Sequence, residues 1–209
     1  MKQVDEARLE TDLKYRFEYL SEFIGFSPSD VALIHAAAQP LMPYIPALVE
    51  ATYARLLSYS ATARHFVPRQ FGYEGPLPEG VEALGQETEQ IRFRKEHLRR
   101  YLLSLVGNPY DERMIKYLDV VGKIHTPLAG NKQIDVPLVQ MNALMGVLSD
   151  VLADAISRLD LALDEERRTL RAFNKLLWIQ NDLINRHYAG RAEAQPSPPA
   201  SAPARSAWR

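Results

Sequence analysis

One histidine stands out in this sequence for the chemistry that its neighbours would allow. A predicted helix places Leu118, Val121 and His125 on one face, so that an apolar stripe ends in an imidazole. Gly122 lies one turn before the histidine, where a missing side chain would let a large, flat group approach the backbone. A neutral imidazole in this setting can bind a metal, or it can be a core histidine satisfied by hydrogen bonds. The local pattern alone favours the core histidine.

The composition and the motifs exclude several other kinds of site. Cysteine is absent from the 209 residues, which rules out disulfides, thiolate metal sites and cysteine nucleophiles. The chain has no glycine-rich phosphate loop, HExxH zinc motif, EF-hand ligand series or GxSxG motif. A carboxylate-bridged di-iron bundle needs a glutamate three residues before a ligating histidine. The residues at that spacing from the five histidines are Ala32, Thr62, Arg94, Gly122 and Ile184.

Charge and hydropathy indicate which partners and which cellular compartment to expect. The formal net charge of -1 gives no general attraction to nucleic acid or to an anionic membrane. The charged N-terminus has no apolar signal core, and we expect no run long enough to span a bilayer. The absence of cysteine fits a reducing compartment. We therefore expect a cytoplasmic protein that binds neither nucleic acid nor membrane.

Hydrophobic periodicity predicts an all-α chain of about eight helices. They are expected at about 4–24, 28–38, 45–57, 61–66, 82–106, 109–125, 136–159 and 164–188. Asn108 is the expected cap of the helix that bears His125, and a polar loop should connect that helix to Pro137. Residues 1–189 are expected to form one domain, and the Pro/Ala/Ser-rich residues 190–209 a disordered tail.

A helical chain with one imidazole on an apolar face suits haem, an apolar plate whose iron takes one neutral histidine. His125 would then be the iron ligand. Tyr53 lies on the inward side of its predicted helix and offers a hydroxyl that can donate to a diatomic ligand; a half-buried core tyrosine is the alternative. His97 is adjacent to Glu96 and close to Arg99 in the sequence, and it is expected to face solvent.

Several segments, together with the helix before Ile24, carry a family resemblance. They are EATYARLLSYSATARHF, RKEHLRRYLLSLVGNPYDERMIKYLDVVGKIHTPL, DVPLVQMNALMGVL and FNKLLWIQNDLINRHY. In these segments the chain resembles the protoglobins, the family that also includes the sensor domains of globin-coupled sensors. The resemblance covers most of the chain, from about Leu13 to Tyr188. It implies a globin-like fold with an extra N-terminal helix and a bound haem b.

The resemblance also implies residues on the proximal side of the haem. His125 matches the proximal ligand of the family, and Gly122 matches the glycine usually found three residues before it. Val121, beside this glycine, is included among the expected haem contacts. The helix that closes the pocket is matched by Val136, Met141, Leu144 and Val147.

On the distal side, Tyr53 matches the tyrosine of the third helix in the family. Thr52 stands where some members have a large aromatic residue, a departure that implies a more open distal pocket. Leu98 matches the inward position when residues are counted back from His125 without gaps. Some members have phenylalanine there, so Phe93 would take this place if the alignment shifts.

The function implied is reversible binding of O₂, CO or NO for sensing or storage. The alternatives are a haem enzyme, such as an NO dioxygenase or a peroxidase-like activity with an external reductant, and a haem-free helical interaction module. No output or reductase domain is recognised in the sequence, so a separate signalling or reductase partner is expected. Family members commonly form homodimers through their last two long helices, and the broad apolar surface of 136–159 agrees with this.

Overall fold

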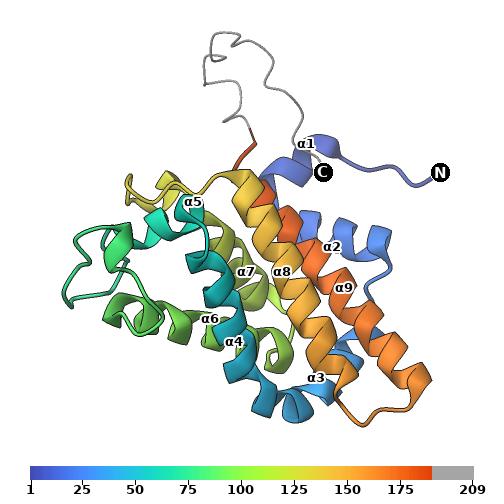
Figure 1. Ribbon diagram of the computed structural model, residues 1–209. Coiled ribbons are helices and arrows are strands. Elements are labelled where there is room, and N and C mark those ends of the chain that lie inside the picture. The colour runs from blue at the N-terminus through green and yellow to red at the C-terminus, as the bar shows by residue number, and fades with distance from the viewer. Residues whose placement is uncertain (190–209) are drawn as a thin grey trace, which may run out of the picture.

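The computed structural model describes residues 1–189, which contain nine α-helices and no strand (Figure 1). The helices are α1 (Glu6–Thr11), α2 (Leu13–Ile24), α3 (Pro28–Leu41), α4 (Ile45–Leu57), α5 (Ser60–Ala63), α6 (Glu89–Gly107), α7 (Glu112–Lys123), α8 (Leu138–Ser157) and α9 (Leu163–Asn185). The all-α class expected from the sequence is confirmed. The predicted disordered tail, 190–209, lies outside the described residues.

Short polar side chains decide where several helices begin. The predicted helix 4–24 is divided at Asp12, whose backbone is extended and whose carboxylate accepts a hydrogen bond from the amide of Tyr15. The histidine-bearing helix begins later than predicted, because its cap is Asp111 and not Asn108. The Asp111 carboxylate accepts from the amide of Met114 at 2.9 Å.

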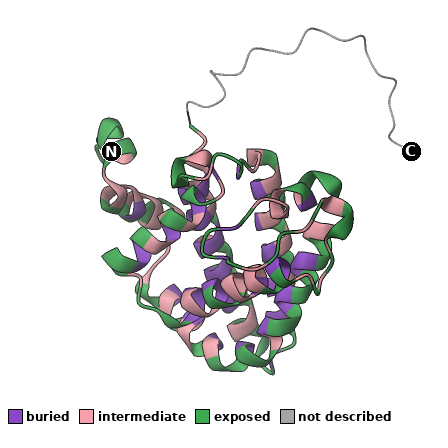
Figure 2. Cartoon of the chain, turned by 90° about the vertical axis from the view of Figure 1, so that its left-hand side faces the viewer, coloured by how far each residue is buried: buried purple, intermediate pink, exposed green. Residues whose placement is uncertain are grey.

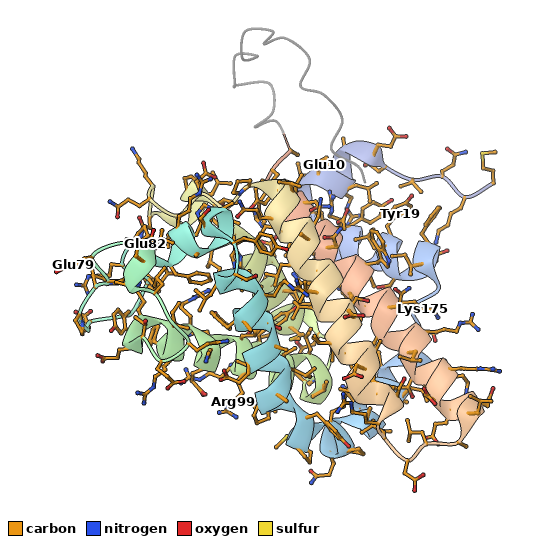
Figure 3. The ribbon with its side chains drawn as sticks, in the orientation of Figure 1. Glu10, Tyr19, Glu79, Glu82, Arg99 and Lys175 are labelled. Carbon is orange, nitrogen blue, oxygen red and sulfur yellow. The ribbon has the colours of Figure 1, made fainter. Side chains whose placement is uncertain are left out.

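Other helix boundaries also differ from the prediction. α3 continues through Pro40 to Leu41, and the 3₁₀ turn η1 (Met42–Tyr44) links it to α4. α6 begins at Glu89 and not near residue 82. The segment before it, which carries Glu79 and Glu82, forms one margin of the molecule (Figure 3).

The helices pack around α9, which contacts α2, α3, α7 and α8, while α4 contacts α6 and α8. In Figure 1, α8 and α9 run side by side in opposite directions. Leu176, Ile179 and Leu183 of α9 are fully shielded from solvent. Figure 2 shows that buried residues gather on the sides of the helices that face the interior. This is the arrangement that amphipathic helices require to bury their apolar stripes.

Two stretches have the length and hydropathy of a membrane span, Pro28–Leu57 and Leu138–Ser157, although we expected none. A core helix of a globular protein passes the same test of length and composition. The first stretch is broken by the turn η1 between α3 and α4, and the second is α8, which packs against α4 and α9. Packing within the bundle accounts for part of their apolar character, since 28% of the first stretch and 33% of the second are buried.

Candidate functional site

A cavity of about 230 Å³ is lined by residues of α4 to α9 and of the segments that follow α5 and α7. One water molecule needs roughly 10–15 Å³ of such volume, so the cavity has room for a far larger group. Of the side chains expected at the site, those that line the cavity are Tyr53, Leu98, Val121, His125, Val136, Met141 and Leu144. Phe93, Gly122 and Val147 do not line it.

His125 was predicted to lie within its helix. In the structure it lies just beyond the end of α7. The helix ends at Lys123, and the amide of His125 donates to the carbonyl of Gly122 in a tighter turn. The amide of Val136 then donates to the His125 carbonyl at 3.0 Å. The loop between His125 and Val136 therefore returns to the histidine and holds its backbone in place.

The hydrogen bond of the His125 ring selects its tautomer. Nδ1 lies 2.8 Å from the carbonyl oxygen of Val121. Because a carbonyl can only accept, Nδ1 carries the proton, and Nε2 of the neutral ring keeps its lone pair. Histidines that bind metals commonly donate the other ring N–H to a carbonyl or a carboxylate in this way. The ring lines the cavity, so a group bound there can meet an imidazole in its ligating form.

The charge state of His125 agrees with this role. Burial lowers its pKa to about 4, and the positive charge of Arg94 also acts against protonation. The side chain is half-buried and borders the cavity. At neutral pH the imidazole is therefore uncharged, as a metal ligand must be.

Gly122 serves a contact different from the one expected. A Cβ at this position would lie 2.8 Å from Cα of Ile184 and 2.9 Å from the carbonyl oxygen of Leu183, both in α9. The missing side chain therefore lets α7 lie close to α9. It does not make room for a ligand in the cavity. The expectation that it lets a flat group approach is wrong, because the sequence does not say which neighbour a glycine faces.

Polar contacts hold α7 on α9 around this close approach. The Asp119 carboxylate accepts from Nη1 of Arg186 at 2.7 Å and from Nε2 of His187 at 2.9 Å. Gln180 donates to the carbonyl of Leu118 at 3.2 Å from a fully buried position. Because the Leu118 carbonyl belongs to the α7 backbone, these contacts fix the end of α7, and with it the start of the turn that carries His125, relative to the core.

Tyr53 is nearly fully buried on α4 and lines the cavity, with its ring 5.6 Å from that of Phe66. Burial raises the pKa of its hydroxyl, and the nearby Arg94 guanidinium opposes part of this rise. The phenol therefore stays protonated and able to donate. Thr52 also lines the cavity, and its hydroxyl is already used in a 2.8 Å hydrogen bond to the carbonyl of Leu48.

His97 does not face solvent as predicted. It is half-buried and lines the cavity, and its Nδ1 lies 2.9 Å from the carbonyl oxygen of Phe93. Phe93 packs between Tyr73 and His97, with ring centroids 5.3 Å and 4.4 Å away. Leu98 and not Phe93 therefore meets the cavity, in agreement with the ungapped count from His125.

Further polar residues that the sequence did not indicate reach the cavity, and two of them, Arg94 and His65, carry nitrogen atoms without a partner. Nε of Arg94 and Nε2 of His65 are both buried without a hydrogen-bond partner. The signal that could have identified Arg94 is its position four residues before Leu98 and seven before Tyr101, which places the three on one helix face. His65 gives no comparable signal, because it follows a helix of only four residues.

The cavity fits a haem group better than a bare metal ion. Its walls are mainly apolar, and His125 presents one neutral imidazole nitrogen. No group of three or more His, Cys, Asp or Glu residues in 1–189 could hold a metal ion by itself. A flat cofactor that brings its own metal and needs one axial nitrogen matches this set of donors.

Comparison with known proteins gives the family. No curated protein matches the chain. A family model described as Protoglobin matches residues 13–193, which is most of the sequence and includes every helix from α2 to α9. The chain therefore belongs to the Protoglobin family, a family of globin-type haem proteins that bind diatomic gases.

Proposed function

We propose that this protein holds haem b through His125 and reversibly binds O₂, CO or NO for sensing or storage. The observation that supports this best is the hydrogen bond from Nδ1 of His125 to the Val121 carbonyl. It leaves the lone pair of Nε2 free to bind a metal, on a ring that lines the cavity. Ligation by a histidine in this tautomer needs no rotation of the ring and no loss of a proton.

When bound, the haem iron supplies the reversible coordination of a diatomic gas. The chain supplies the surroundings. The Val121 carbonyl orients the imidazole, and the apolar side chains of Leu98, Met141 and Leu144 keep water from the cavity. Tyr53 contributes a hydroxyl that can donate a hydrogen bond to the gas, because burial keeps it protonated.

The test is absorption spectroscopy of protein reconstituted with haemin. The wild type is expected to show a Soret band that shifts on reduction and on addition of CO. His125→Ala should lose it, and added imidazole should restore it, because imidazole can replace the missing ligand in the space left by the side chain. His35→Ala is the matched control, since Nε2 of His35 donates a hydrogen bond to the backbone carbonyl of Asn108, away from the cavity.

The outcomes of this test are decisive. A wild type without a Soret band would leave a haem-free interaction module as the function. An unchanged spectrum in His125→Ala would show that another residue holds the iron, with His65 and His97 as the other histidines of the cavity.

We further propose a homodimer through α8 and α9. Val139 of α8 and Trp178 of α9 are 73% and 60% exposed, and apolar side chains exposed together on neighbouring helices can mark a protein interface. Sedimentation of the wild type and of Trp178→Glu tests this. A dimer in the wild type and a monomer in the variant are expected; an equal mass for both would contradict the proposal.

A further inference from the structure

Arg94 carries a positive charge into a mainly apolar cavity without a counter-ion. Its Nε is buried and has no hydrogen-bond partner, and the guanidinium forms no ion pair with any carboxylate in residues 1–189. Its helix neighbours differ: Lys95 pairs with Glu50 at 2.6 Å, and Arg99 pairs with Glu96 at 2.7 Å. Arg94 as a whole is half-buried, so its charge is partly shielded from water, and no carboxylate offsets that cost. An anionic group is therefore expected at this position.

The position of Arg94 points to the interior of the cavity. Arg94, Tyr53 and His125 line the same cavity, and the positive charge of Arg94 influences the pKa of both of the other side chains. Tyr53 is 4% exposed, and an anion that contacts both it and Arg94 must therefore sit well inside the protein. Leu98, one helical turn after Arg94, supplies the apolar wall beside this place.

We propose that Arg94 and Tyr53 form a subsite for a small inorganic oxyanion of the nitrite type, next to the position of the haem iron. The planar guanidinium can donate two parallel hydrogen bonds to two oxygens of one anion, and the Tyr53 hydroxyl can donate a third. The inference rests on the proposed haem function and adds a class of ligand to it: an anion besides the neutral gases.

A carboxylate of the haem itself is the other anion that could pair with Arg94. A propionate arm is attached to the edge of a large ring and is best solvated near the protein surface. The near-complete burial of Tyr53 favours the free oxyanion, because such an ion can enter a small space between two donors. The experiment distinguishes the two.

The test is a titration of the ferric, haem-loaded protein with sodium nitrite, followed at the Soret band. Arg94→Leu is expected to weaken nitrite binding by about 10- to 100-fold, the range for a charge-assisted hydrogen bond in a buried site. Arg94→Lys should retain part of the affinity, since an ammonium keeps the charge but loses the two-pronged geometry.

Two controls make the result specific. Arg99→Leu removes an arginine from the same helix that is 44% exposed and lies on the outer side of the bundle, and it should change nitrite affinity by less than about 2-fold (Figure 3). CO is neutral and offers no negative charge for the guanidinium to bind. Its affinity for the ferrous form should therefore change by less than about 3-fold in Arg94→Leu.

Several results would overturn the proposal. Unchanged nitrite affinity in Arg94→Leu would do so, as would equal losses for nitrite and CO, which would indicate a structural role for Arg94. Faster transfer of haem to apomyoglobin with unchanged nitrite affinity would assign Arg94 to a propionate. A wild type that takes up no haem would overturn the proposed function and this inference with it. If Arg94→Leu fails to fold, as judged by circular dichroism, Arg94→Gln and Arg94→Lys provide the same comparison.

Discussion

Replacing Gly122 with alanine should destabilise the protein even in the absence of any ligand. The added Cβ would lie 2.8 Å from Cα of Ile184, 2.9 Å from the carbonyl oxygen of Leu183 and 3.1 Å from Cδ2 of His187. The first two are backbone atoms of α9, which cannot rotate away as a flexible side chain would. α7 must therefore move away from α9, or the backbone of α9 must bend.

The magnitude follows from two opposing effects. Alanine is favoured over glycine within a helix by about 1 kcal/mol, whereas overpacking a filled interface costs about 1–3 kcal/mol. Because the obstacle is backbone, we take the upper end of that cost and expect a net loss of about 2 kcal/mol. In a domain of this size, that loss lowers Tm by roughly 4–8 °C.

The assay is thermal and urea unfolding of the haem-free protein, with Gly107→Ala as the matched control. Gly107 is also close to the C-terminus of a long helix, but a Cβ there would meet no atom within 4 Å. The control should therefore be between unchanged and about 1 kcal/mol more stable. Haem should also leave Gly122→Ala faster, because His125 lies only three residues after Gly122 and moves with the displaced helix.

Equal stability of the haem-free wild type and Gly122→Ala would refute this reasoning. If only the haem-loaded form were weakened, the glycine would serve the approach of the cofactor, as the sequence suggested. A loss of stability in the haem-free protein assigns it to the contact between α7 and α9.

Three other predictions concern the distal tyrosine, the C-terminus and an interior acid. Tyr53→Phe should dissociate O₂ roughly 2- to 12-fold faster in stopped-flow measurements, the equivalent of one hydrogen bond; an unchanged rate would contradict a donor role. Deleting 190–209 should leave the Soret band intact, and loss of the band would show that these residues belong to the fold. Burial opposes ionisation of Asp30, but hydrogen bonds from Lys175 and Ser27 outweigh it and hold the pKa of this carboxyl below its usual value. Asp30→Asn should therefore cost about 1–2 kcal/mol at pH 7, and this difference should shrink below about pH 4, as the wild-type carboxylate becomes protonated; an equal difference at pH 7 and pH 3 in urea unfolding would contradict it.

Much of the helical architecture could be read from the residues because periodicity is a local property. The apolar positions of α4, α8 and α9 repeat at helical spacing, and those helices lie within a few residues of where they were predicted. The misplaced boundaries arise where one polar side chain competes for backbone amides. Asp12 and Asp111 both do this, and sequence pattern alone did not show that they would prevail over their neighbours.

The inward direction of Tyr53 could be predicted from its helix face, and the family resemblance added Leu98, Met141 and Leu144; all four line one cavity. A helix wheel shows which side is apolar. It does not show how far a polar residue at the edge of that side is turned inward. Arg94 and His97 lie at such an edge of α6, and the packing of α6 against α4 decides that both reach the cavity.

The sequence alone therefore establishes the all-α fold and the family. It also indicates the expected ligand, a histidine that follows an apolar helix face. The tertiary structure decides the tautomer of His125, because the Val121 carbonyl is correctly placed only once the turn after α7 has formed. It also decides that Gly122 faces α9 and that Arg94 reaches the cavity with its buried Nε unpaired. The physical reason is common to all three. The residue type determines whether a side chain can donate or accept a hydrogen bond and how much space it fills. Which atoms lie next to that side chain depends on how helices distant in the sequence pack together.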